Sequence, residues 1–281
     1  MESEIEIPLD EVIQEAELEK VLAEPAEPLA IGPSEPVTFD ILLHTDEFVA
    51  IDKPRGFHVH QPEMQRRRVA REIICLPNLR NQIQTWLYPV HRIDVATEGV
   101  LVFALSKAAA GNLCRQFQNG TIRKTYFAIV RGWTKDEGTI DIPLELDSTN
   151  IPVESVTRYK THARVELPFA VGKRHKSARY SFVEAWPETG RFHQVRRHFA
   201  RLAHPIIGDR SHGDSHHNGF FRSQFDSPGL WLKAKSIEFT HPATGEPIRI
   251  DSPWNARWTT ILGQLGMSYS TDSTLDDQGR R

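Results

Sequence analysis

The chain runs from a polar loop into its longest apolar segment at Tyr88-Pro89-Val90-His91-Arg92-Ile93-Asp94-Val95-Ala96-Thr97-Glu98-Gly99-Val100-Leu101-Val102-Phe103-Ala104-Leu105. Pro89 and Gly99 bracket the loop, and residues 100–105 predict a buried strand. Loops that enter a rigid strand often present functional groups. If this loop is extended, Arg92 and Asp94 point to one side and Ile93 points to the other.

Asp94 has two interpretations on these residues alone. An aspartate in such a loop can serve as a nucleophile or a base if water is excluded and a cation keeps it ionised. Alternatively, Arg92 and Asp94 form an ordinary salt bridge within a loop, which is the commoner role of an Arg-x-Asp sequence. The loop alone does not separate the two.

The segments around the loop predict many strands and a few helices. Ser106 is the predicted N-cap of a helix over residues 107–118, which Asn119-Gly120 ends. Hairpins are expected over residues 41–51 and 232–250, further strands over 125–130, 163–167 and 180–186, and a helix over 193–203 that stops at His204-Pro205. Many strands, few helices and no regular β-α-β alternation predict an α+β fold with a largely antiparallel, mixed sheet and flanking helices.

The predicted helix 193–203 is amphipathic and carries one arginine in an unusual place. Val195, Phe199 and Leu202 lie on the apolar arc, and Arg196 lies at its edge. An arginine there needs an anion, for which Asp94 is a candidate, or it extends to solvent from the flank of the helix. The opposite arc carries Gln194, Arg197, His198 and Arg201.

The strand over residues 125–130 follows two bases, Arg123 and Lys124. Tyr126 in this strand could stack on a flat ligand. A single strand tyrosine is more often a core residue, so the residue pattern favours the core.

Length and composition exclude several protein classes. The 281 residues are 39% hydrophobic and 25% charged, which is typical of a soluble globular protein with one large domain. The two cysteines form neither a disulfide framework nor a CxxC pair. No apolar segment is long enough to cross a bilayer, and the acidic N-terminus does not resemble a signal peptide. We therefore expect a soluble, cytoplasmic protein with no membrane partner. We also expect it to act as a monomer.

Charge divides the chain into an acidic leader and a basic body. Residues 1–36 contain eleven acidic residues and one lysine, whereas residues 37–281 contain 26 acidic and 33 basic residues, a net charge of +7. A basic body suggests a polyanionic partner, because neutralised phosphates release counterions. We expect an acidic N-terminal extension over residues 1–36, a catalytic domain over 37–265 and a polar tail over 266–281.

Four motifs together resemble the RluA-type pseudouridine synthase family. Their order and spacing match that family from about residue 39 to residue 254. The motifs are Asp52-Lys53-Pro54-Arg55-Gly56, His91-Arg92-Ile93-Asp94-Val95-Ala96-Thr97-Glu98-Gly99, Lys124-Thr125-Tyr126-Phe127-Ala128-Ile129-Val130-Arg131-Gly132 and Gly190-Arg191-Phe192-His193-Gln194-Val195-Arg196, the last continuing to His204-Pro205-Ile206-Ile207-Gly208-Asp209. The stretches 79–83 and 197–218 look most like the branch of this family that acts on the uridine at tRNA position 65.

The resemblance implies a fold, a reaction and a site. The fold is the pseudouridine synthase fold with a central RNA-binding cleft, and the reaction needs no cofactor and no metal. Asp94 matches the catalytic aspartate, Arg196 the arginine that ion-pairs with it, and Tyr126 the tyrosine packed against the flipped uracil. Arg92 matches the arginine that enters the stack where the base leaves. Further candidates for RNA contact or base flipping are His91, Arg123, Lys124, Arg191, Gln194 and Arg197.

Two residues depart from the family pattern, and three other functions stay open. Ile93 stands where the family often has leucine, which is a mild change. Glu98 stands where the family has a small residue, which places an acid near the expected RNA. The alternatives are a synthase directed to ribosomal RNA, a non-catalytic RNA-binding or folding factor, and a metal-dependent hydrolase. The residues that could ligate a metal in the last case are His212, His216, His217, Asp209 and Asp214.

Overall fold

The computed structural model describes residues 37–61, 69–146, 151–172 and 175–267. The predicted extension 1–36 and most of the predicted tail 266–281 lie outside these residues. The elements in chain order are β1 (Asp40–His44), β2 (Phe48–Lys53), the short 3-10 helix η1 (Arg71–Ile73), α2 (Cys75–Ile83), β3 (Tyr88–Pro89), β4 (Glu98–Ala104), α3 (Lys107–Gln118), β5 (Arg123–Arg131), β6 (Glu137–Asp141), β7 (Leu144–Glu145), β8 (Pro152–Val153), β9 (Val156–Leu167), β10 (Ala178–Pro187), α4 (Gln194–Arg201), α5 (Ser215–Phe225), β11 (Leu232–Thr240), β12 (Pro247–Asp251) and α6 (Ala256–Gln264).

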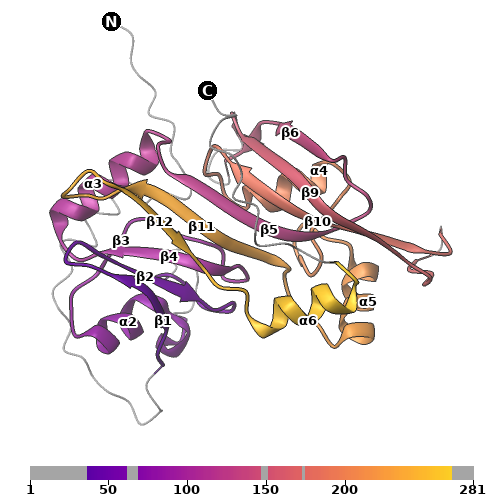
Figure 1. Ribbon diagram of the computed structural model, residues 1–281, viewed down its shortest axis with the longest axis horizontal. Coiled ribbons are helices and arrows are strands. Elements are labelled where there is room, and N and C mark those ends of the chain that lie inside the picture. Colours follow the sequence, from indigo (N-terminus) through magenta and orange to yellow (C-terminus); the bar gives the residue numbers. More distant parts are fainter. Residues whose placement is uncertain (1–36, 62–68, 147–150, 173–174, 268–281) are drawn as a thin grey trace, which may run out of the picture.

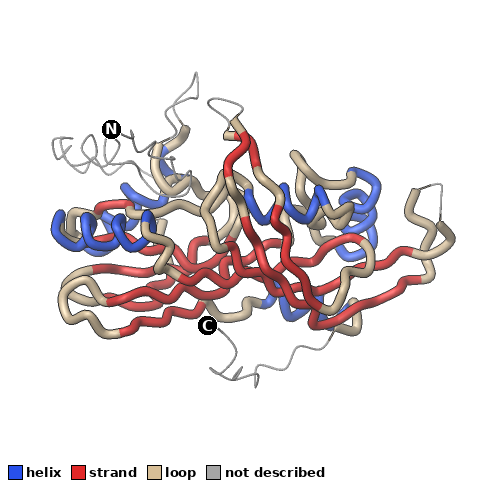
Figure 2. Tube along the Cα trace, turned by 90° about the horizontal axis from the view of Figure 1, so that it is seen from above, coloured by secondary structure: helices blue, strands red, loops and turns tan. Residues whose placement is uncertain are grey.

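One bent sheet runs through the molecule (Figure 1). Its strand order is β1-β2-β4-β11-β5-β10-β9-β6, with β12 paired to β11 and β3 paired to β4. Within the described strands, β4 and β11 run parallel and the other paired strands run antiparallel. Figure 2 shows the strands as one continuous layer flanked by helices. The predicted α+β class with a largely antiparallel, mixed sheet is confirmed.

Several predicted elements are observed near their predicted ends. Helix α3 spans Lys107–Gln118, and the Ser106 hydroxyl accepts a hydrogen bond from the Ala109 backbone N–H at 3.1 Å, as expected for an N-cap. β1 and β2 form the first predicted hairpin, and β11 and β12 form the last one. Local turn and cap residues carry enough information to place these elements.

Other elements differ from the prediction because tertiary pairing forms them. β9 begins at Val156, seven residues before the predicted start at Ala163, because its polar first half pairs with β6 and β10. Helices α2, α5 and α6 were not predicted. α5 contains histidine, asparagine and glycine, which are weak helix formers. The Asp214 carboxylate caps it by accepting the N–H of His216 at 2.9 Å.

The sheet is buried on both faces along its central strands. Val100 and Val102 of β4 pack with α3 on one face, while Leu101 and Phe103 pack with α2 on the other. β5 follows the same rule, with Ala128 packing toward α4 on one side. On its other side, the aromatic side chains of α5 and α6 cover Phe127 and Ile129. Burial on both faces explains why β4 is an uninterrupted apolar run.

The loop of residues 90–97 lies on the same side of the sheet as α4. Ile93 from the loop and Val195 from α4 belong to one apolar cluster with Tyr126 of β5. The packing of these three side chains brings residues 94 and 196, which are 102 positions apart in sequence, into direct contact. The fold therefore builds its candidate site where the loop before β4 meets the first turn of α4.

Gly99 allows the loop to enter the sheet. Its φ is +121°, and a Cβ atom there would lie 2.0 Å from the Ala234 carbonyl oxygen of the parallel neighbour β11. We expect Gly99→Ala to lower the free energy of unfolding by about 3 kcal/mol or more, because backbone strain and steric overlap add. Urea unfolding followed by tryptophan fluorescence measures the loss.

The matched control is Gly120→Ala after α3. Gly120 also has a positive φ, +65°, but its missing Cβ would meet no atom within 4 Å. This variant should lose only about 1–2 kcal/mol, the ordinary cost of a left-handed non-glycine residue. Equal losses in the two variants would contradict the assigned role of Gly99.

Candidate active site

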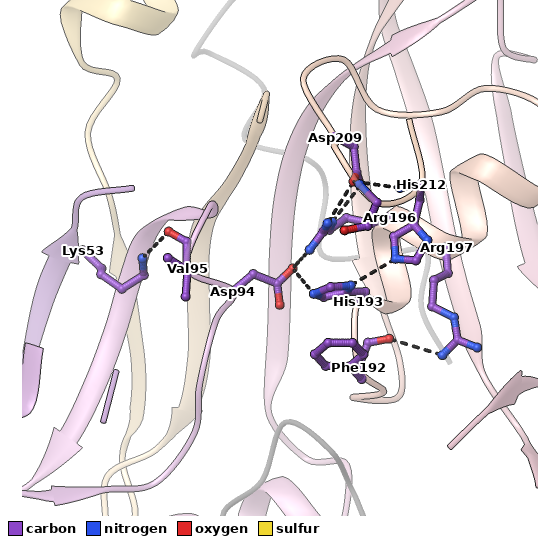
Figure 3. Close-up of polar contacts among 10 residues, drawn as sticks. Lys53, Asp94, Val95, Phe192, His193, Arg196, Arg197, Asp209 and His212 are labelled. Atoms are coloured by element: carbon purple, nitrogen blue, oxygen red, sulfur yellow. Dashed lines mark hydrogen bonds and ion pairs between the residues drawn. The ribbon is translucent and has the colours of Figure 1, made fainter. Parts of the chain in front are cut away.

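The loop before β4 alternates between buried and accessible side chains, as the sequence predicted. His91 and Ile93 are buried, Arg92 is exposed, and Asp94 is 23% exposed. Arg92 and Asp94 therefore face outward together. Their arrangement does not form the simple Arg-x-Asp loop salt bridge, because the partner of Asp94 comes from α4 (Figure 3).

Lys53 at the end of β2 holds the loop from behind. Its ammonium group is fully buried and donates to the carbonyl oxygens of Pro54 at 3.0 Å, Phe57 at 3.1 Å and Val95 at 3.4 Å. Burial lowers the pKa of Lys53 to about 8, although nearby acids including Asp94 favour its charged form. The Gly56 N–H also donates to the Val95 carbonyl, at 2.6 Å. These bonds fix the backbone immediately after Asp94.

Arg196 is buried and bridges two carboxylates. Its Nη1 donates to Asp94 Oδ2 at 2.8 Å, while Nε and Nη2 donate to Asp209 Oδ2 and Oδ1 at 2.7 and 2.8 Å. Burial disfavours the charge, but the hydrogen bonds and the charges of Asp209 and Asp94 outweigh it and raise the pKa of Arg196. Of the two sequence interpretations of Arg196, the pairing with Asp94 is the one observed.

Asp209 supports this arginine and was not predicted to do so. Its side chain is 1% exposed, and its Oδ1 also accepts the backbone N–H groups of Ser211 at 2.9 Å and His212 at 3.0 Å. Burial opposes ionisation, but the Arg196 hydrogen bonds and charge prevail and lower the pKa of Asp209. A guanidinium has five N–H donors, and Asp94 alone cannot accept all of them. A buried arginine at position 196 therefore indicates a second acceptor besides Asp94, and this acceptor is Asp209.

A pocket of about 600 Å³ opens beside Asp94. Its wall includes Arg196 and Asp209, and three further arginines line it with exposed side chains: Arg55, Arg92 and Arg210. We call this the basic pocket. The Arg92 guanidinium lies 6.0 Å from the centre of the Phe192 ring at the same wall. Arg55 and Arg210 were not among the predicted site residues, because each stands in a loop with no periodic pattern.

Tyr126 lies in the apolar cluster and also next to Asp94. It is 6% exposed and lines a second, smaller space of about 20 Å³ together with Asp94, His193 and Arg196. We call this the inner space. Its volume fits about one water molecule. The core interpretation of Tyr126 therefore agrees with its burial, and its predicted role against a uracil stays a prediction.

Two residues predicted to contact RNA, His91 and Gln194, have side chains that are buried and engaged inside the protein, and their contact with RNA stays a prediction. His91 is 4% exposed, accepts the Val102 N–H at Nε2 and stacks on Phe117. Gln194 is 1% exposed and donates to the Val156 carbonyl and the Thr157 hydroxyl. Both residues position the site from within.

The remaining predicted contacts divide by exposure. Arg191 is buried and donates to the Glu154 carbonyl at 3.2 Å, so its side chain is engaged within the protein. Arg197 is 13% exposed and donates to the Glu145 carbonyl at 2.9 Å. Lys124 is half-buried and donates to the Thr189 carbonyl, whereas Arg123 is exposed. Arg123 stays a predicted RNA contact.

Glu98 does not face RNA, contrary to the expectation. It is 5% exposed and accepts hydrogen bonds from Arg257 Nη1 at 2.7 Å, Trp258 Nε1 at 2.8 Å and Asn255 Nδ2 at 2.7 Å. Three donors satisfy the buried carboxylate, so it has no need of solvent or substrate. Arg257 also donates to the Leu230 carbonyl at 3.0 Å. Glu98 thus ties the start of β4 to α6.

The three histidines of the hydrolase hypothesis have separate surroundings. His212 pairs with His193 at 3.0 Å, His217 pairs with the Tyr180 hydroxyl at 2.9 Å, and the His216 side chain is 73% exposed. In the part of the chain that the structure describes, no three His, Cys, Asp or Glu side chains form a metal-ligand group. None of the described helices is long and apolar enough to span a bilayer.

The comparisons with known proteins agree with this geometry. The solved structure "Human RNA Pseudouridylate Synthase Domain Containing 1" superposes with a TM-score of 0.62 at 22% identity, covering 86% of this chain and all of that one. The fold is therefore that of pseudouridylate synthase domains. Residues 47–201 match the family described as RNA pseudouridylate synthase. The chain belongs to the RNA pseudouridylate synthase family, which confirms the resemblance drawn from the motifs.

Two relatives show how far the similarity extends. A tRNA pseudouridine synthase C of Vibrio parahaemolyticus is 41% identical over 238 residues, which are 80% of this chain and 95% of that protein. A tRNA pseudouridine synthase C of Pectobacterium carotovorum is 40% identical over 237 residues, which are 81% of this chain. The chain spans only 62% of the length of this second relative.

The buried histidines generate a prediction about acid stability. Burial lowers the pKa of His91 from 6.5 to about 3. Below about pH 6 the unfolded chain binds a proton that folded His91 does not, so this residue should reduce the free energy of unfolding by about 1.4 kcal/mol per pH unit as the pH falls toward 4. Urea unfolding between about pH 7 and pH 4 measures the slope.

The control is His91→Gln, which retains an acceptor for the Val102 N–H but does not titrate. The free energy of unfolding of this variant should fall less steeply as the pH falls than that of the wild type. The difference in slope should correspond to about one bound proton. Parallel curves for the two proteins would show that His91 does not remain neutral in the folded state.

Proposed function

We propose that this protein converts a uridine of tRNA to pseudouridine, and that the target is the uridine at position 65 in the T-stem. The observation that carries the proposal is the Asp94–Arg196 ion pair at the wall of a pocket lined with arginines. The family supports the reaction, and the relatives named tRNA pseudouridine synthase C support tRNA as the RNA.

The reaction matches what this site can do. Pseudouridylation breaks the bond between C1′ and N1, turns the uracil, and joins C1′ to C5. It neither oxidises the substrate nor transfers a group to a second molecule. The group that it needs is an anion beside the sugar and the base. Arg196 pairs with Asp94 and orients it, while the open side of Asp94 faces the pocket.

The target base has to leave its helix before it reaches Asp94. Unstacking costs a few kcal/mol, and a side chain has to fill the gap. Arg92 suits this role because it is exposed at the rim of the basic pocket and its planar cation can stack. Tyr126 lines the inner space next to Asp94. Because that space holds about one water molecule, side chains around it have to move before a uracil can pack on Tyr126.

The basic pocket suits the phosphates on either side of the flipped nucleotide. Arg55 and Arg210 stand on different loops at its rim, and both have exposed side chains. Contacts of this kind position an A-form stem through its backbone and 2′-hydroxyls. Residues 37–265 then serve as the catalytic domain, acting as a monomer in the cytoplasm.

Mapping of the product tests the proposed target. Purified protein is incubated with tRNA and ribosomal RNA transcripts, and pseudouridine is located by primer extension after carbodiimide treatment. We expect a stop in the T-stem of tRNA. A stop only in ribosomal RNA favours the synthase directed to that RNA, and binding without any stop favours a non-catalytic RNA-binding factor.

Asp94→Asn should abolish pseudouridine formation and retain tRNA binding. The amide keeps the shape of the side chain but carries no charge, so it cannot act as the anion. Product mapping and filter binding measure the two properties. Asp46→Asn, an exposed position in the β1–β2 turn, is the matched control and should behave as the wild type. Near-normal product formation by Asp94→Asn would defeat the assignment.

Arg196→Ala should lower turnover strongly, because Asp94 loses its partner. It also leaves Asp209 as a buried charge without its cation, which destabilises a protein by about 3–5 kcal/mol. Arg196→Lys separates the two effects, since it keeps a cation but cannot bridge both carboxylates. We expect a folded lysine variant whose turnover is lower by at least about 100-fold. Wild-type turnover in that variant would show that the bridge is not needed.

A further inference from the structure

His193 is held in an unusual backbone conformation at the edge of the site. It is the N-cap residue of α4, with φ 53° and ψ 27°, in the left-handed region that non-glycine residues rarely occupy. Strain of this kind persists where surrounding structure imposes it, often at functional sites. The ring is 16% exposed, stacks on Phe192 with ring centres 3.7 Å apart, and lines both the basic pocket and the inner space.

The two ring nitrogens of His193 face different groups. Nε2 lies 3.8 Å from Asp94 Oδ2, and Nδ1 lies 3.0 Å from His212 Nε2 (Figure 3). In a hydrogen bond between two imidazoles, one nitrogen donates and the other accepts. The partner at Nδ1 therefore determines whether Nε2 of His193 carries a proton or a lone pair. His212 has its own position fixed, because its backbone N–H donates to Asp209.

The charges around His193 leave its imidazole neutral and able to accept a proton. The pKa of His193 is lowered to about 4, mainly by burial and also by the charges of Arg196 and His212, although Asp94 and Asp209 act in the opposite direction. When Nε2 takes up a proton, the imidazolium lies beside the Asp94 carboxylate, which stabilises the new charge.

We propose that His193 is a catalytic residue of the isomerisation and removes the proton from C5 of the rearranged uracil, with His212 as its positioning residue. This inference rests on the proposed function. When C1′ has left N1 and joined C5, the C5 atom holds both C1′ and a hydrogen. Nε2 of His193 accepts that hydrogen as a proton, and the electron pair of the C–H bond returns to the ring. The imidazolium of His193 then releases its proton through water to N1, so His193 is neutral again and the product has the same composition as the substrate.

In the required tautomer, Nδ1–H of His193 donates to Nε2 of His212 and leaves the Nε2 lone pair of His193 toward the pocket. His193 needs no movement of the main chain to reach a base bound beside Asp94, because both side chains line the same two spaces. A positioned general base accelerates a step by about 100- to 10,000-fold.

The test uses single-turnover kinetics on a tRNA transcript that the wild type modifies, prepared with hydrogen or deuterium at C5 of uridine. We expect His193→Gln to react at least about 100-fold more slowly. It should also show a larger deuterium isotope effect on pseudouridine formation than the wild type, because C5–H cleavage becomes limiting. A role of His193 in structure alone would slow the reaction without increasing the isotope effect.

Two further variants sharpen the result. His193→Gly removes the ring and suits the positive φ, so added imidazole should restore part of its rate. His212→Gln should slow the reaction less than His193→Gln, and exposed His216→Gln should match the wild type. A wild-type rate in His193→Gln, or a slow rate with an unchanged isotope effect, overturns the proposal. If the wild type itself forms no pseudouridine, the proposed function fails instead, so the two failures are distinguishable.

Discussion

The candidate site depends on one guanidinium placed between two carboxylates. Arg196 is 7% exposed, and its three donor atoms are occupied by Asp94 and Asp209 at 2.7–2.8 Å. Electrostatic attraction is strong there because little water screens it, and each group left alone would be a costly buried charge. The bidentate contact to Asp209 fixes the plane of the guanidinium, and that plane determines where Asp94 lies. Asp94 keeps an accessible side, so the bridge holds a reactive carboxylate without covering it.

The rest of the fold brings these groups together from distant parts of the chain. Lys53 holds the loop after Asp94 from the end of β2, and Glu98 ties the start of β4 to α6. Both are charged groups in the interior, and hydrogen bonds satisfy each of them. They act on either side of Asp94 in the loop of residues 90–97, which leaves Asp94 little freedom to move. Such a preorganised anion suits a reaction that requires charge stabilisation more than group transfer.

The site also separates two tasks by exposure. The arginines at the rim of the basic pocket have exposed side chains and suit a phosphate backbone, while Asp94, His193 and Tyr126 line the narrow inner space. Contacts to phosphate position an RNA and carry little information about its sequence. In the proposed function, the choice of uridine therefore depends on which nucleotide the fold of the RNA presents to the inner space.

Local sequence determined the elements that carry their own stop and start signals, and tertiary structure decided the rest. Ser106, Asn119 and Gly120 bound α3 because a cap and a left-handed turn are short-range features. The motifs identified the family and Asp94, since their order survives without coordinates. The helix pattern alone left Arg196 undecided between Asp94 and solvent, although the family resemblance implied the pairing with Asp94. The sequence also led us to expect His91, Gln194 and Arg191 in contact with RNA and Glu98 near it. Only the packing of the fold decides whether a polar side chain is buried among hydrogen-bond partners or exposed to a ligand. The sequence does not contain this information, because the partners come from distant parts of the chain.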